Sequence, residues 1–202
     1  LKWIDDNGDD GVFFDIGANV GIYSIYFAKT KKNNVYAFEP SFFNLSLLAK
    51  NIHKNKVHEK IHIITNPLTN YKKFADFNLT NIDEGGALSA FGVNFNQDGK
   101  DLEKLLSYKT LGLPLDFLLT EKILPEVPKM IKIDVDGIEH LILLGAKKTL
   151  KDSKCKTVLI EINEKFKEQA SESEKILTEC GFSLKEKYHA VEETYNQIWF
   201  KD

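Results

Sequence analysis

The feature that most constrains the fold is an alternation of short apolar runs with longer amphipathic segments over residues 12–65. The runs Val12–Ile16, Val35–Phe38 and Ile61–Thr65 are rich in β-branched and aromatic residues, which is typical of buried strands. Between them, apolar residues recur three and four positions apart, as in Ser41–Asn55, and this spacing predicts helices. Strand, helix, strand, helix, strand in that order is one half of a doubly wound parallel sheet.

The second half of the chain continues the pattern after a less regular stretch. In residues 70–128 we predict short strands over Phe74–Leu79 and Ala87–Val93 and a helix over Leu115–Ile123. Beyond them the sequence predicts strand, helix, strand, helix and two final strands, over Met130–Val135, Gly137–Leu150, Thr157–Ile162, Glu164–Cys180, Phe182–Lys187 and Gln197–Lys201. We therefore expect one α/β domain over residues 1–202, with a doubly wound, mostly parallel seven-stranded sheet, helices on both faces and an antiparallel last strand.

Charge and composition exclude several classes of protein. The chain has 27 basic and 30 acidic residues and a net charge of −3, which disfavours a sequence-independent nucleic-acid binder. Every basic residue is lysine, so anions must be held by backbone N–H groups, helix N-termini or lysine. No apolar stretch is long enough to span a membrane, and two cysteines are too few for a disulfide framework. We expect a cytoplasmic protein.

A glycine turn follows the first predicted strand. Gly17 and Gly21 have the spacing G-x-x-x-G, not the G-x-G-x-x-G of dinucleotide-binding proteins, so a nicotinamide-dependent oxidoreductase is a disfavoured alternative. Glu39 follows the second strand, about 20 residues after the turn, where α/β nucleoside sites bind ribose hydroxyls. Together these features point to an adenosine-containing ligand without a diphosphate.

Five segments carry a resemblance to a known family. In this order they resemble the FkbM family of S-adenosylmethionine-dependent methyltransferases, and the Lys132–Glu139 block is the most specific of them. The segments are Asp15–Gly21, Phe38–Pro40, Ile131–Glu139, Gly145–Ala146 with Leu150, and Leu159–Ile162. The sequence departs from the family pattern at Asp136, where Glu is usual, and at Asn66-Pro67-Leu68, where Asn is usually followed by small residues.

The resemblance implies S-adenosyl-L-methionine as cofactor and methyl transfer to oxygen, on a hydroxyl of a sugar, glycan or polyketide-type small molecule. Carried over residue by residue, it assigns the ribose to Glu39, beside Pro40, and the edge of the adenine to Asn66. It assigns the methionine end of the cofactor to the turn residues Asp15, Gly17, Ala18, Asn19 and Gly21. A protein of the same fold that binds the cofactor without methyl-transfer activity remains the alternative.

The candidates for acid–base chemistry lie on the later strands. Lys132 and Asp134 share one face of a buried strand, so they are either a structural ion pair or groups that face the reaction. Asp134 is the first candidate for the base and Glu161 the second. Asp134, Glu161 and Asn163 could instead hold Mg²⁺ or Ca²⁺, although we assign no metal.

Two further expectations concern the neighbourhood of these groups. Asp136 and Glu139 have the spacing of a capping box at the start of a helix. The irregular segment Gly85–Asn96 is expected to form the acceptor pocket, because variable segments near the carboxyl edge of such sheets build substrate sites. We expect no nucleic-acid partner.

Overall fold

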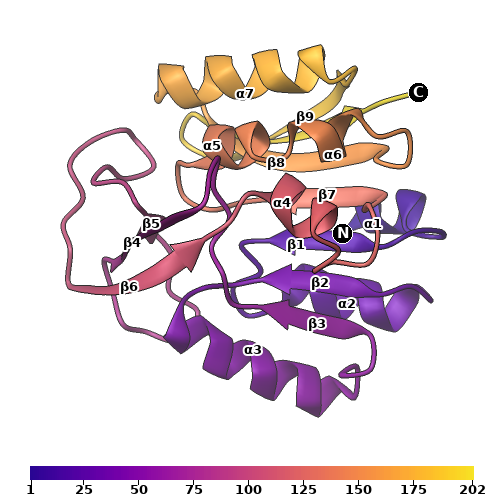
Figure 1. Ribbon diagram of the computed structural model, residues 1–202, viewed down its shortest axis with the longest axis horizontal. Coiled ribbons are helices and arrows are strands. Elements are labelled where there is room, and N and C mark those ends of the chain that lie inside the picture. Colours follow the sequence, from indigo (N-terminus) through magenta and orange to yellow (C-terminus); the bar gives the residue numbers. More distant parts are fainter.

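The computed structural model describes residues 1–202 and has a seven-stranded central sheet with strand order β3-β2-β1-β7-β8-β10-β9 (Figure 1). The first five strands of that order are parallel, and β10 pairs antiparallel with both β8 and β9. The strands are β1 Phe13–Ile16, β2 Val35–Phe38, β3 Ile61–Ile64, β7 Met130–Ile133, β8 Thr157–Asn163, β9 Ser183–Val191 and β10 Thr194–Phe200. The predicted doubly wound α/β fold is confirmed.

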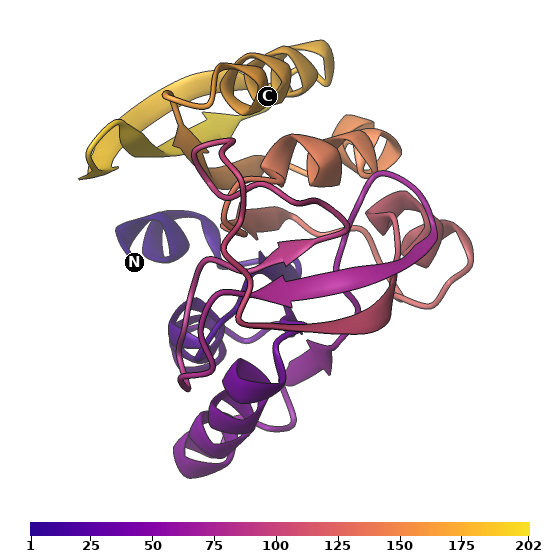
Figure 2. The same cartoon turned by 90° about the vertical axis from the view of Figure 1, so that its left-hand side faces the viewer.

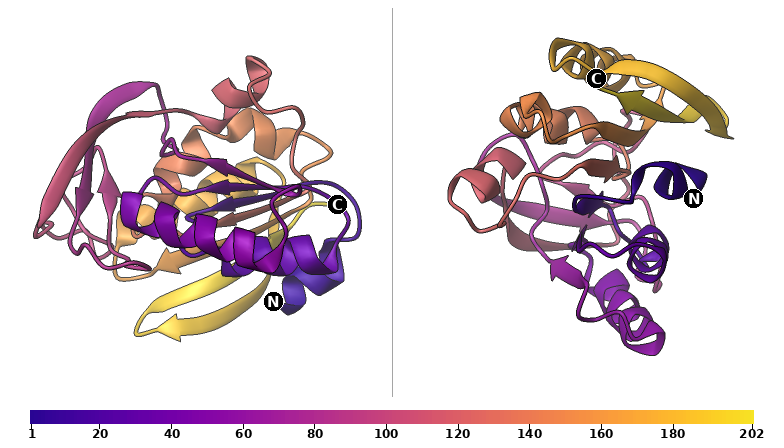
Figure 3. Two further views of the ribbon diagram at one scale, coloured as in Figure 1. Left: turned by 90° about the horizontal axis from the view of Figure 1, so that it is seen from below. Right: turned by 90° about the vertical axis from the view of Figure 1, so that its right-hand side faces the viewer.

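Helices cover both faces of this sheet (Figure 3). They are α1 Lys2–Asn7, α2 Ile22–Thr30, α3 Phe42–Asn55, α4 Leu115–Thr120, α5 Glu139–Leu144, α6 Lys147–Lys151 and α7 Lys167–Glu179. Because side chains alternate along a strand, Phe13 packs in the core beneath α1, α2 and α3, while Phe14 packs in the larger core beneath α4 to α7. None of these helices has the length and apolar character needed to cross a membrane.

A second, smaller sheet lies across the carboxyl edge of the central sheet (Figures 1 and 2). Its strand order is β5-β4-β6, with β4 Lys73–Leu79, β5 Ala90–Phe91 and β6 Leu106–Gly112. The strand predicted over 74–79 is confirmed, but the one predicted over 87–93 shrinks to two residues. β6 was missed because it carries exposed residues at most of its positions.

The helix predicted over Gly137–Leu150 is broken into α5 and α6. The carbonyl of Gly145, which the N–H of Thr149 would use in a continuous helix, instead accepts the N–H of Asp116 at 2.9 Å. Asp116 then accepts the N–H groups of Lys148 and Thr149, both at 2.8 Å, at the start of α6. The break is therefore imposed by contacts from distant parts of the chain.

Candidate active site

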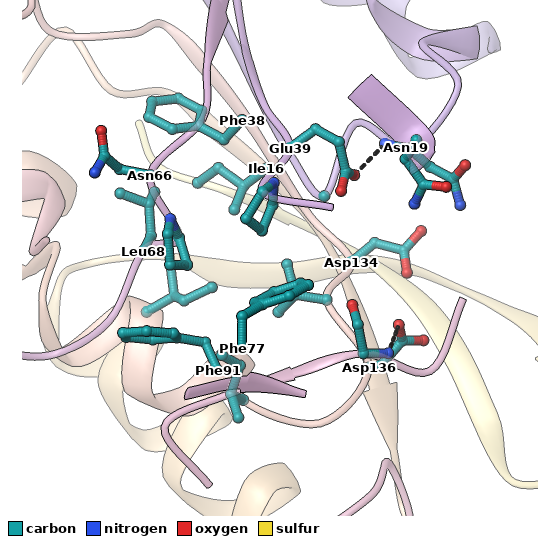
Figure 4. Close-up of a pocket in the computed structure, with 18 of the residues that line it drawn as sticks. Ile16, Asn19, Phe38, Glu39, Asn66, Leu68, Phe77, Phe91, Asp134 and Asp136 are labelled. Carbon is teal, nitrogen blue, oxygen red and sulfur yellow. Dashed lines mark hydrogen bonds between the residues drawn. The ribbon is translucent and has the colours of Figure 1, made fainter. Parts of the chain in front are cut away.

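A cleft opens where β1, β2 and β7 end, and the small sheet forms its far wall (Figure 4). Its free space, including the open mouth, is about 680 Å³. One part is apolar and is lined by Ile16, Phe38, Leu68, Phe77, Phe91 and Ile142. The other part is polar and is lined by Gly17, Asn19, Glu39, Asp134 and Asp136.

The glycine turn holds the end of β1 against β2 and β7. Gly17 has φ +76°, and a Cβ there would lie 1.8 Å from the backbone oxygen of Asp134, so only glycine fits at this position. The N–H groups of Gly17 and Ala18 both donate to the carbonyl of Phe38 at 3.0 Å. The N–H of Asn19 donates to Glu39 Oε2 at 2.8 Å.

Glu39 is the buried carboxylate of the cleft, with 4% of its surface exposed. Its Oε1 accepts the N–H of Ser41 at 2.8 Å, so each oxygen already holds one backbone N–H and keeps a free lone pair. Burial raises the pKa of Glu39, and the hydrogen bonds from Ser41 and Asn19 oppose that rise. The group is therefore a fixed, pre-oriented acceptor.

Lys132 joins the turn to the candidate base. Its Nζ donates to the Gly17 carbonyl at 2.9 Å and lies 3.3 Å from Asp134 Oδ2 and 3.6 Å from Asp15 Oδ1. Burial alone would lower the pKa of Lys132, but Asp134 and Asp15 outweigh it and raise the pKa. The side chain is a buried ammonium that does not line the cleft, so it positions other groups and touches no ligand there.

Several predicted cofactor residues lie behind the cleft. Asp15 is buried, and its Oδ2 accepts the N–H and the hydroxyl of Ser24 in α2 at 3.1 and 2.6 Å. Neither it nor Ala18 nor Gly21 lines the cleft, whereas Gly17, Asn19, Glu39, Pro40 and Asn66 do. Asn66 Nδ2 donates to the carbonyl of Leu111 at 2.9 Å.

Glu161 lies on β8 next to Asp134. The last registered pair of β7 and β8 is Ile133 with Ile160, so the two acids follow it on adjacent strands. Burial first, and then the negative charge of Asp134, raise the pKa of Glu161 to about 8. At neutral pH this carboxyl is therefore mostly protonated and can donate a hydrogen bond.

The predicted capping box does not form. α5 begins at Glu139, and Asp136, with φ +63°, accepts the N–H groups of Leu88 and Ser89 at 2.7 and 3.3 Å instead. Glu139 does reach back, to the N–H groups of Val135 and Gly137 at 3.1 Å each. Asp136 thus ties the segment after Gly85 to the cleft.

The segment containing Gly85 and Gly86 forms one wall of the cleft. Asn19 Nδ2 donates to both glycine carbonyls at 3.3 Å, and Asn44 Nδ2 donates to the carbonyl of Gly86 at 3.0 Å. Ala87 and Ser89 line the cleft. Sequence reasoning missed Asn44, and its only signal was a polar residue on the inner face of α3.

The oxygen donors that could have held a metal do not converge. Asn163 Nδ2 donates to the carbonyl of Gln97 at 3.0 Å and to Asp98 at 2.7 Å, and its Oδ1 accepts the N–H of Lys165. No group of three His, Cys, Asp or Glu side chains has a metal-binding arrangement.

A family model described as the methyltransferase FkbM domain matches residues 15–184. The chain belongs to the FkbM methyltransferase family. No curated protein matches the sequence. The fold is that of Rossmann-like methyltransferases, as comparison with solved structures shows.

Three solved structures illustrate this similarity of the FkbM chain. The FkbM methyltransferase of Methylobacillus flagellatus KT has a TM-score of 0.62 at 17% identity, over 95% of this chain and 44% of that one. SMU.1697c of Streptococcus mutans, a putative methyltransferase in complex with SAH, has a TM-score of 0.56 at 11% identity, over 96% of this chain and 89% of that one. An rRNA methylase of Streptococcus thermophilus has a TM-score of 0.55 at 12% identity, over 96% of this chain and 87% of that one. The chain thus spans less than half the length of the first structure.

The raised pKa values of Asp136 and Glu161 in this FkbM chain lead us to expect that its stability depends on pH. Burial raises the pKa of Asp136 to about 7 and that of Glu161 to about 8, both above their values in an unfolded chain. A carboxyl group whose pKa is raised by folding stabilises the folded chain while it is protonated. This stabilisation is complete when the pH is below the pKa of the group in the unfolded chain, and it is lost as the pH rises through the pKa in the folded chain. We expect the melting temperature to fall between about pH 5 and 8, and Glu161→Gln to flatten that fall. The control Glu193→Gln, at an exposed position, should leave the fall of the melting temperature with pH unchanged. Equal slopes of melting temperature against pH in the two variants would contradict the pKa assignment.

Proposed function

We propose that the chain is an S-adenosylmethionine-dependent O-methyltransferase that acts on a hydroxyl of a sugar, glycan or polyketide-type small molecule. The observation that carries the proposal is the buried Glu39 carboxylate, held by the turn at Gly17 on one side of a cleft whose other side presents Asp134. Family membership supports methyl transfer, and the acids at the cleft support oxygen as the acceptor atom.

The residues of the cleft fit the proposed cofactor. Glu39 keeps free lone pairs for two ribose hydroxyls, and the apolar part between Phe38, Leu68 and Phe77 suits a purine ring. Asn19 Oδ1 is buried without a hydrogen-bond partner, which is costly unless a ligand donates to it. S-adenosylmethionine, when bound, supplies a methyl group activated by its sulfonium sulfur.

The chain's own contribution to the reaction is to position and deprotonate the acceptor. The Lys132 ammonium lies 3.3 Å from Asp134 Oδ2 and orients this carboxylate, which can accept the proton of a hydroxyl. A base in this position contributes roughly 10²–10⁴-fold to the rate. Glu161, protonated at neutral pH, can donate a hydrogen bond to the acceptor beside it.

Glu39→Ala is expected to weaken binding of S-adenosylhomocysteine by roughly 1.5–3 kcal/mol, about ten- to hundredfold, because hydrogen bonds to a charged group are lost. Calorimetric titration measures this, with Glu59→Gln as an exposed control. Unchanged affinity in a folded Glu39→Ala variant would refute the ribose assignment.

Asp134→Asn is expected to keep the fold and the affinity for S-adenosylhomocysteine but to slow methyl transfer by roughly 10²–10⁴-fold, because an amide cannot accept the proton. Lys132 retains the Gly17 carbonyl and Asp15 as partners, so the melting temperature should change little. Radiolabelled methyl transfer to a panel of sugars and polyketide-type alcohols measures the rate. A stable and fully active variant would remove the base role from Asp134.

The alternative is a cofactor-binding protein of the same fold without acceptor chemistry. It predicts the same loss of affinity in Glu39→Ala but no labelled product from any member of the panel. The half-buried pair of Asp134 and Glu161 favours the enzyme, because two acids at one edge are costly to retain for binding alone.

A further inference from the structure

A trough runs along the face of the central sheet opposite α7, between α1, the start of α2 and the β9–β10 hairpin. Figures 2 and 3 show α1 beside this hairpin. Its free space, including the open side, is about 1040 Å³. The floor is apolar and is formed by Leu159 of β8 and Ile198 of β10, which are registered partners.

One end of the trough lies beside the strand positions that carry the acids. Asn196, which lines it, is the registered partner of Glu161, and Glu161 follows Leu159 on the same face of β8 because strand residues alternate. Tyr23 lines the same end, and its ring centroid lies 5.4 Å from Lys132 Nζ. Asp134 lines the cleft and lies 3.3 Å from Lys132 Nζ, which thus lies between Asp134 and the Tyr23 end of the trough.

The charge of the trough selects what it can bind. Asp6 and Glu186 line it, and its only lysine, Lys2, is paired with Asp6 at 2.6 Å. The carboxylates of Glu186, in the trough, and of Asp134, beyond the end that Tyr23 lines, repel an anionic ligand. The trough therefore suits a neutral or cationic ligand.

The side chains around the trough suit a saccharide. Tyr23 and Tyr188 present amphipathic rings, and Tyr188 is 49% exposed. Asn7 and Asn196 add amide donors and acceptors at the sides. Rings that cover the C–H faces of a sugar, with a few polar groups for its hydroxyls, are the composition of a small-molecule site.

We propose that this trough binds the non-reacting part of the methyl acceptor, and that this part is a neutral or amino-substituted saccharide chain. The inference rests on the proposed function for the identity of the reaction. Beyond the proposed function, the inference states where the acceptor lies and from which face of the sheet it approaches. It also states that anionic saccharides are excluded.

The test is an NMR titration of the ¹⁵N-labelled chain with three trisaccharides: chitotriose, its fully deacetylated amine and trigalacturonate. We expect chitotriose and the amine to shift the amide signals of Tyr23, Tyr188 and Asn196, and trigalacturonate to bind at least tenfold more weakly. A separate titration with S-adenosylhomocysteine should shift Gly17, Asn19 and Glu39 instead.

Tyr188→Ala should weaken chitotriose binding at least fivefold, whereas the control Tyr71→Ala, at another exposed tyrosine just before β4, should not. The inference is overturned if no saccharide binds, if the shifts lie outside the trough, or if trigalacturonate binds equally well. Loss of S-adenosylhomocysteine binding with saccharide binding intact would overturn the proposed function and leave the trough assignment standing.

Discussion

Lys132→Met is expected to lower the free energy of unfolding by about 3–5 kcal/mol, because removing one partner of a buried ion pair leaves the other charge uncompensated. Asp15, 1% exposed, loses its counter-charge, and the Gly17 carbonyl loses its donor. Urea denaturation measures the change. The loss should be accompanied by weaker binding of S-adenosylhomocysteine, since Lys132 anchors the turn at Gly17.

The matched control is Lys109→Met. Lys109 pairs with Asp76 at 2.9 Å, but both side chains are about half exposed, and such surface pairs contribute about 0–1 kcal/mol. If Lys132→Met and Lys109→Met lowered the free energy of unfolding equally, the role of Lys132 as the buried counter-charge of Asp15 would be contradicted.

Gly17→Ala is expected to destabilise the chain by roughly 3 kcal/mol or more, since it adds a clash to the strain of a left-handed residue. The new Cβ would lie 1.8 Å from the backbone oxygen of Asp134, so β1 and β7 must separate at the site. A Gly17→Val variant, with a larger side chain at the same position, should misfold for the same reason.

Gly181→Ala provides the comparison for Gly17→Ala. Gly181 also has a positive φ, +89°, but its Cβ would come no closer than 3.4 Å to the side chain of Lys201. Only the conformational cost of about 1–2 kcal/mol is expected there. Equal losses of stability in the two alanine variants would show that the clash with Asp134 has no effect.

The buried elements of the fold were predictable from the sequence because their signals are local. β1, β2 and β7 are short apolar runs that are buried at every position, and β3 is an apolar run at the edge of the sheet. Each was predicted to within two residues at either end. β6 was not, because its residues are mostly exposed and it pairs with a strand about 30 positions earlier. The break at Gly145 was equally invisible, since Asp116, about 30 positions earlier, takes over the hydrogen bonds of the continuous helix.

The motifs indicated which segments line the cleft but not the direction of each side chain. Asp15 and Lys132 are registered partners on β1 and β7, and both point towards α2, whereas Ile16 faces the cleft. Alternation along the strand indicates that Asp15 and Ile16 point to opposite faces, but not which face carries the ligand. The role of Asp136 was unpredictable for another reason: its partners, Leu88 and Ser89, lie more than 45 positions earlier in the chain.

The central claim is that the cleft at the carboxyl ends of β1, β2 and β7 binds S-adenosylmethionine through Glu39. A crystal structure of the chain soaked with S-adenosylhomocysteine tests it most directly. We expect both ribose hydroxyls on the Glu39 carboxylate, the purine among Phe38, Leu68 and Phe77, and the amino acid end against the turn at Gly17 and Asn19. A ligand bound elsewhere, or bound in the cleft without contact to Glu39, would contradict it.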